Sequence, residues 1–194
     1  MPSHITFTDM RNKPRVYLAL YHRDAQSLKE QDPARQFHSA IMIRPKASKI
    51  RNVPCTVFDA TNFYKFAPDG KILNPNHEWW FRVRDNYDPL TDYRFLGAIM
   101  IGKLPEGKTL ADVDVLLEEL QLPRQNYRET GENCNSWARD AVGALMERKW
   151  AEKMDVEKLF KEALALGQYV LAGITKSEGL REGDRWRNFT TRED

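Results

Sequence analysis

The chain has 194 residues, and its 30 lysine and arginine residues nearly balance its 28 aspartate and glutamate residues, which leaves a formal net charge of +2. This balance gives no electrostatic reason to expect nucleic acid or an anionic membrane as a partner. The hydrophobic fraction of 41% and the charged fraction of 30% are typical of a folded globular domain and exclude a disordered chain. The length favours one domain with a core large enough to fold without disulfides.

The cysteine content and the N-terminal sequence indicate the compartment. Two cysteines, Cys55 and Cys134, are too few for a disulfide framework. Residues 1–14 lack the apolar core of a secretory signal. No apolar run approaches the roughly 20 residues that span a bilayer. We therefore expect a cytoplasmic protein without a membrane span, in a reducing environment.

The first half of the chain has the residue pattern of β-strands, with apolar alternation and many β-branched and aromatic residues. Within residues 15–22, Val16, Leu18 and Leu20 share one predicted face. Residues 67–70 have the composition of a turn. The five predicted strands are residues 15–22, 38–45, 56–63, 78–87 and 93–102.

The period changes to that of helices in the second half. Thr109 and Asp112 form a predicted capping box at the start of the first of three helices. Because strands precede helices, we expect an α+β fold with a mostly antiparallel sheet. A single domain, 15–175, lies between a polar arm, 1–14, and a polar tail, 176–194, in which Trp186 and Phe189 are candidate anchors. The predicted helices are residues 109–120, 133–150 and 155–166.

Cys134 stands at a position where a thiol becomes reactive. Asn133 is a good N-cap residue, which places Cys134 in the first turn of the predicted helix. The unpaired N–H groups and the dipole at a helix start favour a thiolate, and the same amides can face an oxyanion. His38 opens a predicted strand and is the candidate base. A buried, inert cysteine and a core histidine are the structural alternatives.

The order of these motifs resembles a known superfamily. A strand opens with His38-Ser39-Ala40-Ile41, the next strand holds a polar residue in TVFDATN, and a helix opens with NCNSW at 133–137. This order resembles the circularly permuted papain-like (NlpC-type) proteins, in particular the lecithin-retinol acyltransferase-type proteins and the PPPDE isopeptidases. The segments VYLALY, RDNYD and FLGAIMIG also resemble an uncharacterised family of small, mostly fungal proteins. The resemblance covers about residues 15–150.

The resemblance implies a role for each site residue. Cys134 would be the nucleophile and His38 the general base. The third group lies on the strand after the histidine's strand, where Asp59 stands and Asn62 is the fallback. Acyltransferase-type members have a second histidine there, but a carboxylate can also orient the imidazole. The backbone N–H of Cys134 is the expected oxyanion donor, and the other oxyanion or substrate-binding candidates are Asn133, Asn62 and Trp137.

The implied activity is that of a thiol hydrolase or acyltransferase acting on an amide, ester or thioester. Such chemistry passes through a thioester on Cys134 and needs no metal or organic cofactor. The substrate is a small molecule or other acylated compound, or a protein tail. The alternative is a non-catalytic binding module of the same fold with an unreactive Cys134. The sequence leaves open which substrate is used, whether the acyl group passes to water or to another acceptor, and which oligomeric state the protein has.

A second motif offers a weaker alternative. Gly102–Thr109 fits the phosphate-binding pattern G-x-x-x-x-G-K-[ST], with Lys108 in the place that reaches the terminal phosphate. The chain lacks the strand–helix alternation of a parallel sheet, and no later apolar strand ends in an aspartate to hold Mg²⁺. Pro105 also removes one backbone amide. A turn followed by a helix cap accounts for the same residues.

Two remaining features carry less information. His4, His22 and His77 have no partners at metal-ligand spacing, so no zinc site is expected. The aromatic cluster 79–81 fits one wall of an apolar cleft, but alternating aromatics in a strand more often belong to the core.

Overall fold

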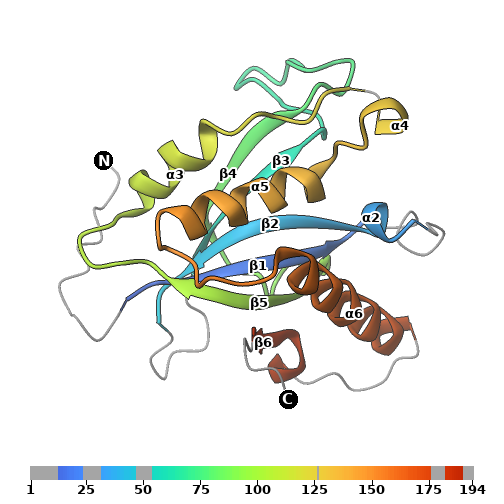
Figure 1. Ribbon diagram of the computed structural model, residues 1–194. Coiled ribbons are helices and arrows are strands. Elements are labelled where there is room, and N and C mark those ends of the chain that lie inside the picture. Colours follow the sequence, from blue (N-terminus) through green and yellow to red (C-terminus); the bar gives the residue numbers. More distant parts are fainter. Residues whose placement is uncertain (1–12, 24–31, 47–53, 126, 176–181, 190–194) are drawn as a thin grey trace.

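The computed structural model describes residues 13–23, 32–46, 54–125, 127–175 and 182–189. Within them, six strands form one sheet in the order β4-β3-β2-β1-β5-β6 (Figure 1). Neighbouring strands pair antiparallel except β5 and β6, which are parallel. The predicted α+β class and mostly antiparallel sheet are therefore confirmed. The strands are β1 (Arg15–His22), β2 (Phe37–Arg44), β3 (Cys55–Thr61), β4 (Trp80–Tyr87), β5 (Phe95–Lys103) and β6 (Trp186–Asn188).

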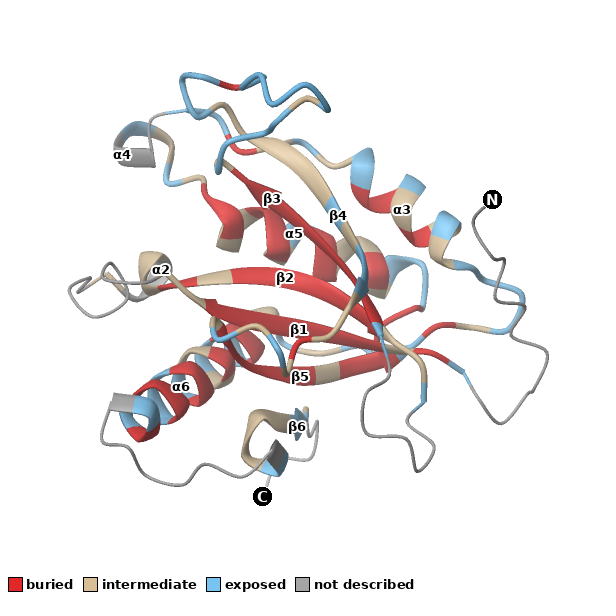
Figure 2. Ribbon diagram, turned by 180° about the vertical axis from the view of Figure 1, so that it is seen from behind, coloured by how far each residue is buried: buried red, intermediate tan, exposed pale blue. Residues whose placement is uncertain are grey.

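Three longer helices cover one face of this sheet (Figure 1). They are α3 (Leu110–Glu118), α5 (Cys134–Glu147) and α6 (Val156–Thr175), and the short elements are α2 (Pro33–Gln36), α4 (Tyr127–Thr130) and η1 (Glu182–Arg185). The larger apolar core lies between sheet and helices and includes Val16, Leu18 and Leu20, as the alternation in β1 predicts. A smaller cluster, with Tyr17 and Tyr21, lies on the opposite face. The central strands are accordingly buried almost throughout (Figure 2).

The predicted element boundaries are close to those observed. β1 has the predicted bounds, and both halves of the Thr109–Asp112 capping box are present. In the aromatic cluster 79–81, Trp79 and Phe81 pack against the larger core. Residues 1–12 of the expected arm, and 176–181 and 190–194 of the expected tail, lie outside the described residues.

Two C-terminal features were not predicted. Helix α6 continues to Thr175 instead of ending at Leu166. Gly167 weakens the helical signal there, but it fits the fold because a Cβ would lie 2.6 Å from a ring carbon of Phe37. The expected tail also contains β6, which pairs parallel with β5. Trp186 acts as the expected anchor, with its ring centroid 5.4 Å from those of Tyr17 and Phe95.

Strands β2 and β3 separate toward one end of the sheet. Their pairing runs over Ile41↔Phe58, Met42↔Val57 and Ile43↔Thr56. On its other side β2 stays paired with β1 as far as Tyr21↔His38 and His22↔Phe37. The backbone of residues 38–40 therefore has no β3 ladder partner among the described residues. Helix α5 packs against β2 and β3. Its first turn meets β2 in this part of the sheet, where the Ser39 hydroxyl donates to Asn135 Oδ1.

Gly102 in β5 lies where the sheet closely approaches the connection from α5 to α6. Its substitution tests this packing. A Cβ on Gly102 would lie 2.6 Å from both Ala151 Cα and the Trp150 carbonyl oxygen. We expect Gly102→Ala to lower the free energy of unfolding by about 1–3 kcal/mol because backbone must move. Gly143 in α5 has open space at the Cβ position, so Gly143→Ala should raise it by about 0.5–1 kcal/mol. Urea denaturation measures both, and equal effects would contradict the packing described.

Candidate active site

His38 and Asp59 meet through their side chains. His38 Nε2 lies 2.5 Å from Asp59 Oδ2, and the exposed fractions of the two side chains are 12% and 0%. Burial alone would raise the pKa of Asp59, but hydrogen bonds and charges from His38 and Arg82 outweigh burial and hold that pKa well below its usual range. Asp59 is therefore ionised, accepts the Nε2–H of His38 and fixes the orientation of the ring.

Two arginines of β4 complete the surroundings of Asp59. Arg82 stands opposite Asp59 in the β3–β4 register. Its Nε donates to Oδ1 at 2.9 Å and its Nη2 to Oδ2 at 2.6 Å, which is bidentate recognition of a carboxylate. Arg84 Nη2 lies 3.9 Å from Oδ2, and its guanidinium lies over the ring of Tyr21 at 4.8 Å. These arginines are not among the residues predicted from the sequence, although their alternation in β4 indicates that they share one face of the sheet.

The start of α5 positions Cys134. The Asn133 side chain accepts hydrogen bonds from the backbone N–H groups of Asn135 and Ser136, at 2.8 and 3.1 Å. Ser136 Oγ in turn accepts the Asn133 N–H at 2.8 Å. Asn133 is thus the N-cap, as predicted, and Cys134 is the first helical residue. An N–H at this position has no partner within the helix, so it can donate to a substrate.

Cys134 and His38 influence each other's ionisation. His38 and the Ser39 backbone N–H lie close enough to Cys134 to influence the ionisation of its thiol. Burial would raise the pKa of the thiol, but the charge and hydrogen bond of His38, the charge of Arg23 and the Ser39 N–H together lower it. Burial would lower the pKa of His38, but the Cys134 charge and the Asp59 hydrogen bond raise it to about 9. These opposite shifts favour an imidazolium–thiolate pair over a neutral thiol and imidazole.

The ring nitrogens of His38 have separate partners. Nε2 is bonded to Asp59, which leaves Nδ1 for the sulfur of Cys134. This is the arrangement of a nucleophile, a base and a group that orients the base. The structure thus brings together Cys134, His38 and Asp59, the three residues expected to act in catalysis.

The other candidate residues have different positions. Trp137 is 1% exposed and packs in the core beside Phe81. It lines a small cavity of about 110 Å³ with Ser136 and Asp140. Asn62 follows β3, and its carbonyl oxygen lies 3.0 Å from His77 Nδ1. Asp59, and not Asn62, is the residue bonded to His38. The side chain of Asn133 is occupied as the helix cap.

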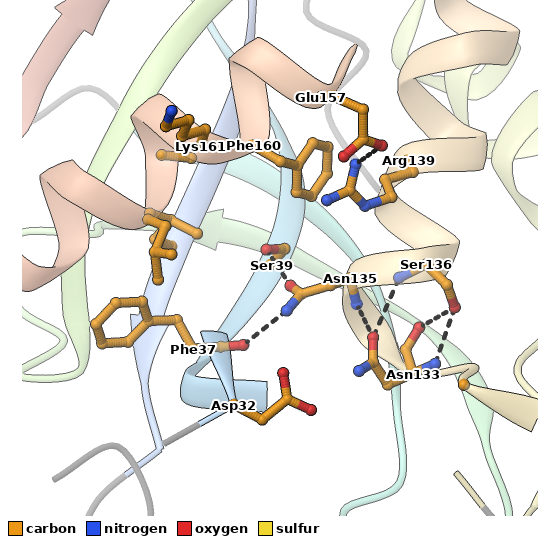
Figure 3. Close-up of a pocket in the computed structure, with 14 residues that line it drawn as sticks. Asp32, Phe37, Ser39, Asn133, Asn135, Ser136, Arg139, Glu157, Phe160 and Lys161 are labelled. Carbon is orange, nitrogen blue, oxygen red and sulfur yellow. Dashed lines mark hydrogen bonds and ion pairs between the residues drawn. The ribbon is translucent and has the colours of Figure 1, made fainter. Parts of the chain in front are cut away.

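A cavity of about 390 Å³ adjoins the start of α5 (Figure 3). Ser39 of β2 and Asn135 of α5 meet at its wall, where the Ser39 hydroxyl donates to Asn135 Oδ1 at 2.5 Å. Asn133 also lines it, so residues on both sides of Cys134 face the same space. Cys134 and His38 themselves are not among the residues that line this cavity.

The residues of the phosphate-loop pattern have structural roles in a turn and a helix cap. Gly102 allows the close approach of Ala151, and Gly107 has a φ of +76°. Thr109 is the N-cap of α3, and Lys108 Nζ lies 3.4 Å from Asp112. The turn-and-cap interpretation accounts for these residues.

The fold and the site define an α+β protein in which a cysteine, a histidine and an aspartate from three elements converge. Residues 13–169 match a family of unknown function (DUF6914), and the chain belongs to this family. The matched region contains all three residues and both arginines. No curated protein and no solved structure matches the chain. Within the described residues, no helix combines the length and apolar character needed to cross a membrane.

The two cysteines allow a matched test of thiol ionisation, because they are 1% and 2% exposed. Burial raises the pKa of Cys55 to about 12, whereas that of Cys134 is lowered. The thiolate fraction at a given pH is larger for the thiol with the lower pKa, so iodoacetamide should label Cys134 faster than Cys55 at pH 7. His38→Ala removes the stabilising cation and should slow labelling of Cys134 at pH 7 at least tenfold. Equal labelling rates of the two thiols in the wild type, together with no effect of His38→Ala on Cys134, would contradict the ion pair.

Substitution of Arg82 tests whether the buried carboxylate of Asp59 needs this partner for stability. Arg82→Met leaves Asp59 without its bidentate partner, and we expect a loss of about 3–5 kcal/mol in the free energy of unfolding. Because the pKa of Asp59 is depressed in the folded protein, its stabilising contribution is present above about pH 4 and is lost as the pH falls. The free energy of unfolding of Arg82→Met should therefore fall less steeply than that of the wild type as the pH is lowered.

An exposed pair provides the control for Arg82. Arg124 binds Glu132 through Nη2 at 2.5 Å, but the arginine side chain is 64% exposed. Arg124→Met should change the free energy of unfolding by no more than about 1 kcal/mol. Denaturant unfolding over a range of pH compares the two variants, and similar losses in both would contradict the role assigned to Arg82.

Proposed function

We propose that this protein is a cysteine-dependent hydrolase or acyltransferase, with Cys134 as nucleophile, His38 as base and Asp59 as the group that orients the base. The observation that carries the proposal is the position of His38, which bonds a buried, ionised carboxylate at 2.5 Å and also contacts the sulfur at a helix start. This arrangement suits attack on the carbonyl carbon of an amide, ester or thioester.

The proposed reaction has two stages. The Cys134 thiolate attacks the carbonyl carbon, a C–S bond forms, and the carbonyl electron pair moves to oxygen. The N–H of Cys134 donates to that oxyanion. As the tetrahedral species collapses, the bond to the leaving group breaks and His38 gives that group its Nδ1 proton. Neutral His38 then takes a proton from water or another acceptor, which attacks the thioester and releases the thiolate.

A permuted papain-like architecture is part of this proposal. In its support, the histidine lies on a strand that precedes the cysteine helix in the chain, and the first turn of that helix meets this strand. The steps need no metal or organic cofactor. Within the described residues neither Cys55 nor Cys134 forms a disulfide, which fits a reducing compartment such as the cytoplasm.

The buried sulfur favours one alternative. Cys134 is only 1% exposed, so a substrate reaches it only after neighbouring side chains move. A non-catalytic binding module of the same fold would retain such a buried thiol without ever exposing it.

An acylation experiment separates the two functions. The protein is incubated with the acetyl thioester of N-acetylcysteamine and analysed by intact-mass spectrometry and for thioester turnover. We expect one acetyl group on Cys134, none in Cys134→Ala, and at least a hundredfold slower turnover in His38→Ala. Added amine or alcohol acceptors then distinguish transfer from hydrolysis. An unmodified wild-type protein with no turnover would favour the binding module.

A further inference from the structure

Asn135, the residue after Cys134, contacts β2 on both sides of His38. Its Oδ1 accepts the hydroxyl proton of Ser39 at 2.5 Å, and its Nδ2 donates to the Phe37 carbonyl oxygen at 3.4 Å (Figure 3). Phe37 and Ser39 are the two chain neighbours of His38. One side chain of α5 therefore binds the strand immediately before and immediately after the histidine.

These two contacts fix the amide of Asn135 in one orientation. A backbone carbonyl only accepts hydrogen bonds, so the NH₂ group faces Phe37 and the amide oxygen faces Ser39. The hydroxyl of Ser39, which can donate or accept, is then the donor. Ser39 is 1% exposed, so its bond is sheltered from competing water. The contact therefore depends on an amide at position 135 and a hydroxyl at position 39.

The contact occupies the part of β2 that β3 leaves unpaired. The β2–β3 ladder ends at Ile41, whereas β2 stays paired with β1 as far as Phe37. On the side away from β1, the Asn135 side chain bonds to this segment, while its own backbone N–H donates to the N-cap Asn133 at 2.8 Å. Asn135 thus ties the end of β2 to the first turn of α5, the two segments that carry the histidine and the cysteine.

We propose that Asn135 and Ser39 are positioning residues that set the distance between the His38 ring and the Cys134 sulfur. The inference rests on the proposed function, because this distance matters for chemistry only if the two groups react together. Without the contact, the strand end and the helix start can separate, and the attraction within an ion pair weakens as its charges move apart. Neither side chain needs to touch the substrate, so the loss falls on kcat and not on KM.

Substitution of Ser39 tests this inference. Ser39→Ala removes the donor, whereas Ser39→Thr keeps the hydroxyl and can place its added methyl group in the adjoining cavity. We expect the alanine variant to lower kcat for the acetyl thioester of N-acetylcysteamine at least tenfold with little change in KM, and the threonine variant to restore most of it. The pH profile of Cys134 labelling by iodoacetamide should move to higher pH in Ser39→Ala and return in Ser39→Thr. A loss of stability alone would not move this profile.

Asn135→Ala is a second variant, which keeps the test decisive if Ser39→Ala fails to fold, and it completes a double-mutant cycle. It also removes the bond to Phe37, so its loss of kcat should be at least as large as that of Ser39→Ala. Because the two side chains act through one bond, adding Ser39→Ala to Asn135→Ala should lower kcat by no more than about a further twofold. Losses that multiply fully in the double variant overturn the inference.

Thr56, near the start of β3, provides a matched control. It is 5% exposed, and its hydroxyl donates to Asp85 Oδ1 at 3.0 Å between β3 and β4. Thr56→Val removes a buried hydroxyl bond between two elements, as Ser39→Ala does. It should lower the midpoint of urea unfolding but leave the labelling profile of Cys134 unchanged. Identical labelling profiles in the wild type, Ser39→Ala and Asn135→Ala overturn the inference.

The inference and the proposed function fail in different ways. If the wild type turns over the thioester, His38→Ala abolishes turnover, and both Ser39→Ala and Asn135→Ala retain the wild-type kcat, the thiol enzyme stands and the positioning role falls. If the wild type is neither acylated nor active on the thioester, the proposed function falls, and the inference falls with it.

Discussion

The buried charge of Asp59 is the constraint on which the rest of the site depends. A carboxylate without solvent contact needs cations and hydrogen-bond donors within reach, and Arg82 and His38 supply them. Arg82 and His38 both lie against the carboxylate, and the charge of His38 also lowers the pKa of the Cys134 thiol. Each of these charges favours the ionised state of its neighbour. Ionisation of the sulfur is thus coupled to residues on three strands.

The separation of β2 and β3 gives this cluster its geometry. In a fully paired sheet the Ser39 N–H or its neighbours would bond to β3, but pairing ends at Ile41 and the Ser39 N–H instead reaches the sulfur. The first turn of α5 packs at this opening, while Asn133 caps the helix and leaves the Cys134 N–H free of intrahelical bonds. One local departure from regular pairing therefore lets the start of α5, with Cys134, pack against β2.

The sequence predicted those features that depend on local patterns. Alternation located the five long strands, and the N-cap preference of Asn133 located the start of α5. The roles of His38 and Asp59 came from resemblance to a family, because no local signal shows that distant strands bring them together. Arg82 was missed for a related reason, since its contact depends on the register between β3 and β4.

Other differences also have physical causes. Gly167 reduced the helical signal within α6, although the ring of Phe37 occupies the space that a larger side chain would need. The strand β6 is too short and polar to show an alternating pattern. Trp137 belongs to the same helical apolar stripe as Ala138 and Ala141, and packing of that stripe on the sheet places its ring in the core.

The protonation state of His38 tests the account most directly. An NMR titration of its imidazole, compared between the wild type and Cys134→Ser, reports the ion pair without requiring a substrate. The account predicts an imidazolium that persists to about pH 9 in the wild type and a lower pKa in the variant, because the serine carries no negative charge. A ring that titrates near its ordinary pKa of about 6.5 in both proteins would contradict the imidazolium–thiolate pair.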